Sequence, residues 1–122
     1  MTTRQPASQP YEGRDLELGS AVQSWVSSHA AGGVELEGPL EALGMDPTSL
    51  VRLRSPALEA HVHLFYGPYV DVSAFRPGHP EDGAFVGGAN DVTPEQLVSM
   101  LDDLAEMARG GPVAGWLRPA VS

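Results

Sequence analysis

The stretch ALEAHVHLFYGPYVDVSAF, residues 57–75, decides the fold class of this 122-residue chain. On both sides of Gly67-Pro68 the side-chain pattern repeats with a period of two residues, which is typical of strands. Glycine followed by proline between two such runs favours a tight turn, because glycine readily adopts the strained first position of a type II′ turn. We therefore predict a hairpin with strands over 57–66 and 69–75.

The pairing within this hairpin determines which side chains share a face. If Tyr66 pairs with Tyr69, one face holds Ala60, Val62, Leu64, Tyr66, Tyr69, Asp71, Ser73 and Phe75, and the other holds His61, His63, Phe65, Val70, Val72 and Ala74. Neither face is plainly polar. The hairpin is thus expected either to lie between two layers of its own domain or to use one face for contact with another chain.

Two shorter alternating runs precede the hairpin. They cover residues 34–37 and 50–54, and the turn-forming segments Gly38-Pro39 and Asp46-Pro47-Thr48 separate them. A single helical turn could occupy residues 40–43. With the hairpin, these runs predict a sheet of about four strands.

Two segments after the hairpin bear on the edge of this sheet. Residues 76–90 are rich in proline, glycine and acids, and have room for a short strand at 84–86. The terminal segment Trp116-Leu117-Arg118-Pro119 is expected to fold back over the sheet edge, the alternative being a docking segment for another protein.

The clearest helix follows Thr93-Pro94-Glu95-Gln96, which supplies an N-cap hydroxyl, a proline at the first helical position and a capping-box glutamine. Apolar residues then recur with helical spacing at Leu97, Met100, Leu101, Leu104 and Ala108. Gly110-Gly111-Pro112 ends the pattern, so we predict a helix over about 94–109.

A second helix is predicted over about 15–30. Its apolar face carries Leu18, Val22, Trp25 and His29, and Gly32-Gly33 ends it. The elements together predict a single small α+β domain over 15–122, with a mostly antiparallel sheet flanked by an N-terminal and a C-terminal helix in the order α-β-β-β-β-α. Residues 1–14 are expected to form a flexible tail.

Composition excludes several classes of chemistry. The chain has no cysteine and no lysine, which excludes disulfide scaffolds, zinc fingers, thiol nucleophiles and Schiff-base chemistry. Its net charge of −9 disfavours contact with nucleic acid or anionic lipid. No apolar run reaches the roughly 20 residues of a membrane span, and no segment resembles a secretory signal, so we expect a cytoplasmic protein.

Catalytic signatures are also missing from the sequence. There is no Gly-x-Ser-x-Gly motif, and the glycines at 83, 87 and 88 do not follow the Gly-x-Gly-x-x-Gly pattern. Glu81, Asp82 and Asp91 beside those glycines would repel a phosphate. We therefore expect no catalytic residue and no cofactor, and predict that the protein is not an enzyme.

His61 and His63 are the best candidates for metal ligands, because residues two apart on a strand point to the same side. In the predicted register Val72 and Ala74 lie opposite them. A third ligand would then have to come from His29, His79, Glu81 or Asp82. We expect that the two histidines pack beside an aromatic core, and a small metal-binding protein or metalloenzyme using the pair is the alternative.

Acidic residues dominate the second half of the chain, with seven acids and no arginine between Pro77 and Ala108. Helical geometry gathers Glu95, Asp102 and Glu106 on the outer face of the predicted helix, with Asp103 beside them. Asp102 and Glu106 are like charges four residues apart, a mild destabilisation that a basic partner would offset. Tyr66 and Tyr69 at the hairpin tip are further candidate anchors for a partner.

Our leading hypothesis from the sequence is a non-enzymatic protein-binding module, such as an immunity protein, antitoxin, inhibitor or chaperone-like factor. It would bind a protein with a basic surface through Glu95, Asp102, Asp103, Glu106, Tyr66 and Tyr69. A further alternative is a structural subunit of a homo-oligomeric or virion assembly, in which copies associate through the hairpin.

Overall fold

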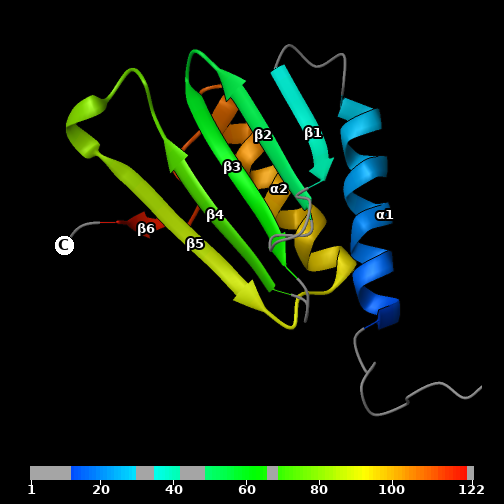
Figure 1. Ribbon diagram of the computed structural model, residues 1–122. Coiled ribbons are helices and arrows are strands. Elements are labelled where there is room, and N and C mark those ends of the chain that lie inside the picture. The colour runs from blue at the N-terminus through cyan, green and yellow to red at the C-terminus, as the bar shows by residue number, and fades with distance from the viewer. Residues whose placement is uncertain (1–11, 30–34, 42–48, 66–68, 121–122) are drawn as a thin grey trace, which may run out of the picture.

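The computed structural model describes residues 12–29, 35–41, 49–65 and 69–120 of the chain (Figure 1). Six strands form one antiparallel sheet in which the spatial order follows the chain order. The strands are β1 (Glu35–Glu41), β2 (Ser49–Ser55), β3 (Leu58–Phe65), β4 (Tyr69–Phe75), β5 (Ala84–Asn90) and β6 (Arg118–Pro119). The helices are α1 (Glu12–His29) and α2 (Pro94–Ala108), and a short 3-10 turn, η2 (Pro80–Asp82), precedes β5. The predicted α+β class is confirmed.

The sheet has more strands than predicted. The short strand expected at 84–86 extends to Asn90 and pairs with the whole of β4. The terminal segment folds back as predicted, and its residues Arg118 and Pro119 pair with Val86 and Phe85 to form β6. The order is therefore α-β-β-β-β-β-α-β rather than α-β-β-β-β-α.

Strand β1 is longer than the alternating run from which it was predicted. It continues through Gly38-Pro39 to Glu41, with an irregularity in its pairing to β2 between Glu37 and Leu40. An edge strand tolerates proline because one side of its backbone needs no ladder partner. The helical turn predicted at 40–43 is wrong for Leu40 and Glu41, and residues 42 and 43 lie outside the described residues.

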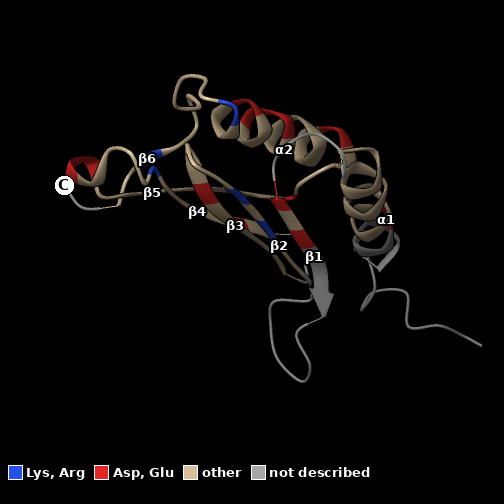
Figure 2. Cartoon of the chain, turned by 90° about the horizontal axis from the view of Figure 1, so that it is seen from above, with Lys and Arg blue, Asp and Glu red and all other residues tan. Residues whose placement is uncertain are grey.

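Both helices pack on the same side of the sheet, as the view from above shows (Figure 2). Helix α2 contacts β2 and β3, and α1 packs against α2 and β1. Helix α1 begins at Glu12, so residues 12–14 of the predicted tail are helical, and residues 1–11 lie outside the described residues. In the described part of the chain no helix is long and apolar enough to span a membrane.

The register of the β3–β4 hairpin differs from the prediction by one residue. Phe65, not Tyr66, pairs with Tyr69. The side chains of β3 and β4 that point toward the helices are therefore all apolar, and they are Leu58, Ala60, Val62, Leu64, Val70, Val72 and Ala74. The predicted register would have divided these residues between the two faces, whereas the observed one places them in a single core layer, which removes more apolar surface from water.

Helix α2 supplies the other side of this core, and its ends follow the sequence signals. Every residue of the predicted apolar stripe is buried, from Leu97 to Ala108. The Thr93 side chain accepts a hydrogen bond from the Gln96 N–H at 3.1 Å. At the other end Gly110 has a positive φ of 97°, and the Gly111 N–H donates to the Glu106 carbonyl at 2.9 Å, as in a Schellman motif.

Candidate functional site

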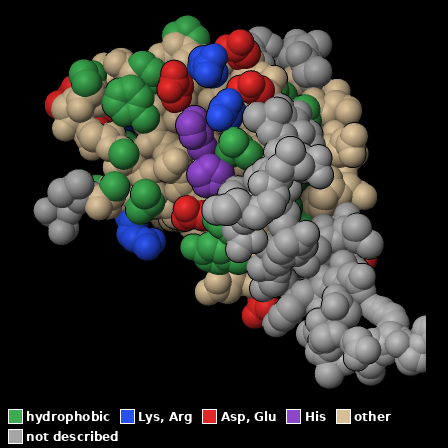
Figure 3. Space-filling view, viewed as in Figure 1, with side chains coloured by type: hydrophobic (Ala, Val, Ile, Leu, Met, Phe, Trp, Pro, Cys, Tyr) green, Lys and Arg blue, Asp and Glu red, His purple; other side chains and the backbone are tan. Residues whose placement is uncertain are grey.

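The face of the sheet opposite the helices is a candidate binding surface, and we call it the open face. No helix in the described ranges covers it. Its centre, on β2 to β4, consists of Leu50, Arg52, Arg54, Glu59, His61, His63, Phe65, Tyr69, Asp71, Ser73 and Phe75. Figure 3 looks onto this face and shows histidine side chains near its middle, with acidic and basic side chains gathered above them and hydrophobic side chains around them.

At the β1–β2 end of the open face, arginine and glutamate side chains form ion pairs that neutralise one another. Arg52 Nη1 lies 2.9 Å from Glu37 Oε1. Arg54 contacts two acids, with Nη1 3.4 Å from Glu35 Oε1 and Nε 3.7 Å from Glu59 Oε2. These pairs are solvent-exposed and contribute little stability. Both arginines that the structure describes at this end of the face, Arg52 and Arg54, are thus paired with acids.

Aromatic rings occupy the middle of the open face. The rings of His61 and His63 have centroids 6.3 Å apart, and the same separation joins His63 to Phe65. Phe65 in turn contacts Tyr69 across the hairpin at 5.3 Å. Tyr69 and Phe75, at opposite ends of β4, are 37% and 38% exposed and are the large hydrophobic residues that the described chain leaves most accessible. Exposed rings of this kind are common anchors at protein interfaces.

A shallow pocket of about 250 Å³ lies on this face, where β4, β5 and β6 meet. Tyr69, Asp71, Gly88, Asn90 and Arg118 are among the residues that line it. Neither Asp71 nor Arg118 has an ion-pair partner among the described residues. The pocket therefore offers one free carboxylate and one free guanidinium to a ligand. The sequence did not indicate this site, because the expected register placed Asp71 away from the histidines and β5 was expected to be short.

The histidine pair has different neighbours from those predicted. His63 faces Asp71 in place of the predicted Val72, and His61 faces Ser73 in place of the predicted Ala74. On the β2 side His61 lies opposite Arg52, whose positive charge disfavours a metal cation. Of the other proposed ligands, His29 stacks on Trp25 with centroids 4.1 Å apart.

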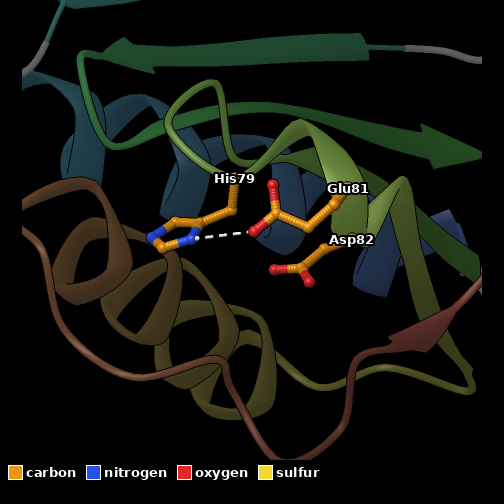
Figure 4. A group of neighbouring side chains, drawn as sticks. All are labelled: His79, Glu81 and Asp82. Atoms are coloured by element: carbon orange, nitrogen blue, oxygen red, sulfur yellow. Dashed lines mark ion pairs between the residues drawn. The ribbon is translucent and has the colours of Figure 1, made fainter.

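The remaining proposed ligands, His79, Glu81 and Asp82, form the one group of three ligand-type side chains that the described residues bring within 4.8 Å of one another (Figure 4). All three are exposed, and they lie at η2, away from the histidine pair on β3. Asp82 already accepts a hydrogen bond from Arg76 at 2.6 Å, and His79 lies 3.5 Å from Glu81. The group is an ordinary set of surface ion pairs.

Burial lowers the pKa of His61 below its ordinary value of 6.5, and the nearby charges of Arg52 and His63 lower it further. As the pH falls, the imidazole of His61 binds a proton in the unfolded chain before it does so in the folded chain. The contribution of neutral His61 to the free energy of unfolding is therefore complete above pH 6.5 and is lost as the pH falls through the folded-state pKa.

We therefore expect the free energy of unfolding of the wild type to fall more steeply from pH 7.5 to about 5.5 than that of His61→Gln, as followed by urea denaturation. Parallel pH profiles for the two proteins would contradict the assignment.

The acidic residues of α2 are largely engaged within the chain. Asp102 Oδ1 accepts a hydrogen bond from Trp25 Nε1 at 2.8 Å and lies 3.8 Å from His29 Nε2. Asp103 Oδ2 accepts one from Trp116 Nε1 at 2.9 Å. Glu106 lies 3.8 Å from Arg109. Neighbours in the same chain thus offset the repulsion that suggested a basic partner for Asp102 and Glu106.

The predicted partner-binding residues do not form one surface. Glu95, Asp102, Asp103 and Glu106 lie on α2, on the helix side of the sheet, whereas Tyr69 belongs to the open face. Tyr66 lies outside the described residues. The exposed large hydrophobic side chains of the described residues, Tyr69 and Phe75, both lie on the open face, which also holds Asp71 and Arg118 of the pocket.

No protein-family model matches this chain, and no curated protein or solved structure shows significant similarity to it.

Proposed function

We propose that this protein is a non-enzymatic binding module that holds a basic, amphipathic segment of another protein against the open face of its sheet. The observation that carries the proposal is the one-sided packing of both helices, which leaves Tyr69 and Phe75 more than one-third exposed on the opposite face. Immunity proteins, antitoxins, inhibitors and chaperone-like factors all act by non-catalytic binding of this kind.

Charge and ring chemistry define the partner. The chain has a net charge of −9, and a field of that sign speeds the encounter with a basic protein. The face itself combines apolar rings with Asp71, so an amphipathic segment with both apolar and basic side chains matches it best. The exposed aromatic side chains would supply most of the affinity, and the long-range charge most of the association rate.

A photo-crosslinking experiment in the native host tests this proposal. Benzoylphenylalanine is placed at position 75 on the open face or, as the matched control, at position 95, which is exposed on α2. We expect an adduct from position 75 with another protein that carries a basic amphipathic segment. With that protein purified, Tyr69→Ser should raise the dissociation constant of the complex by about tenfold or more, as measured by calorimetry.

The other outcomes of the crosslinking each overturn the proposal. An adduct from position 95 but not from position 75 would move the binding surface to α2. Adducts between copies of this chain alone would favour the structural-subunit alternative. Failure to form any adduct from position 75 would remove the open face as a binding surface.

A further inference from the structure

Strand β5 has an outer edge that β6 covers only in part. The sheet ends with β6, whose two residues pair with Phe85 and Val86. The Ala120 N–H also donates to the Ala84 carbonyl at 2.9 Å, which fixes the direction of the β5 backbone. Because successive residues of a strand direct their backbone groups to opposite sides, Gly88 and Asn90 also point their N–H and C=O groups outward. No strand of the described chain pairs with these two residues on that side.

This unpaired edge borders the pocket that holds the free charges. Gly88 lies directly opposite Asp71 in the β4–β5 pairing, and both residues line the pocket. Since Gly88 has no side chain, a long side chain from a strand added beyond β5 can cross above it toward the Asp71 carboxylate. That carboxylate lies about two strand spacings, or roughly 10 Å, from the axis of the added strand. Arginine and lysine have the length and the charge for this position.

The start of β6 limits how far an added strand can extend. Trp116, two residues before β6, packs against Gly87, so a strand lying beside Gly88 must end or turn away there. Arg118 stands at this point, on the rim of the pocket. A strand antiparallel to β5 would bring its carboxyl end toward Arg118, whereas a parallel strand would bring its amino end. A guanidinium favours the carboxylate and repels the amine, which selects the antiparallel arrangement.

We propose that the β5 edge at Gly88–Asn90 binds the C-terminal segment of a basic partner protein as an added antiparallel strand. The partner's free carboxylate pairs with Arg118, and an arginine or lysine side chain lies above Gly88 and pairs with Asp71. The proposal rests on the proposed function and specifies which part of the partner is recognised. It follows the general mode of strand addition, in which backbone hydrogen bonds give affinity and pockets give specificity.

A short synthetic peptide tests the proposal without knowledge of the partner. The probe is fluorescein-labelled Thr-Val-Thr-Val-Arg with a free carboxylate, titrated with the full chain up to millimolar concentration and followed by anisotropy. We expect saturable binding, together with slower hydrogen exchange at the Gly88 and Asn90 amides. Three altered peptides should each bind about tenfold more weakly, since each lacks one charge-assisted or backbone bond. They are the C-terminal amide, the peptide with methionine in place of arginine, and the peptide N-methylated at the arginine amide.

Protein variants provide the complementary test. Asp71→Asn should remove the preference for arginine over methionine, and Arg118→Gln the preference for the free carboxylate over the amide. Glu17→Gln, the matched loss of one exposed charge on α1, should leave both preferences unchanged. Absence of saturable binding, or equal binding of the N-methylated peptide, would overturn the proposal. If crosslinking from position 75 succeeds while the peptide fails, only this inference fails, because Phe75 does not line the pocket.

Discussion

Replacement of Trp25 by alanine is expected to lower the free energy of unfolding by about 3–5 kcal/mol. The indole is only 4% exposed and belongs to the core cluster. Trp25 lies on α1 and joins it to α2, because its Nε1 donates a hydrogen bond to Asp102 at 2.8 Å. Within α1 its ring stacks on His29. Truncation removes the apolar contact and leaves a cavity between α1 and α2. Guanidinium denaturation followed by circular dichroism measures the loss.

Trp25→Phe separates packing from hydrogen bonding in this prediction. The phenyl ring keeps most of the apolar contact but cannot donate to Asp102, so we expect a loss of about 1 kcal/mol from the hydrogen bond and a smaller loss from the reduced ring. A loss below about 1 kcal/mol for Trp25→Ala would show that α1 is held to α2 by other contacts.

The helices were predictable because their signals are local. Thr93, Gln96 and the glycines at 110 and 111 act within one helical turn of the residues that they cap. The roles of the acids on α2 were not predictable in this way. Asp102 meets Trp25 across 77 residues of sequence, so a helical wheel shows the carboxylate on an outer face and gives no sign of its partner.

The hairpin register marks the point at which pattern reasoning failed. Each strand alternates, but the sequence leaves open whether Tyr66 or Phe65 faces Tyr69. A shift of one residue in this pairing changes which side chains of β3 and β4 share a face of the sheet. The choice depends on collecting Val70, Val72 and the apolar residues of β3 under α2, which is a property of the whole core. The same error placed Val72 and Ala74 opposite the histidines and concealed the position of Asp71.

Strand β5 was underestimated because glycine has low strand propensity. Gly87 and Gly88 lie in the middle of the strand, and each is required by a close neighbour rather than by a turn. Gly87 packs against Trp116, and Gly88 lies against the backbone of β4. Such close approach is a known reason for glycine within a strand, but the neighbours become evident only once the sheet is assembled.

Replacement of Gly88 by alanine is accordingly expected to destabilise the fold by about 1–3 kcal/mol, as overpacking does in closely packed sites. A Cβ at this position would lie under 3.0 Å from the Val70 carbonyl oxygen, a backbone atom that cannot rotate away. Gly115→Ala is the matched control, because a Cβ there meets nothing within 4 Å, and it should change stability by less than about 0.5 kcal/mol. Thermal unfolding of the two variants measures the difference. Equal stabilities would mean that β4 and β5 can separate at Gly88, and the close strand approach that forms the floor of the pocket would then lose its support.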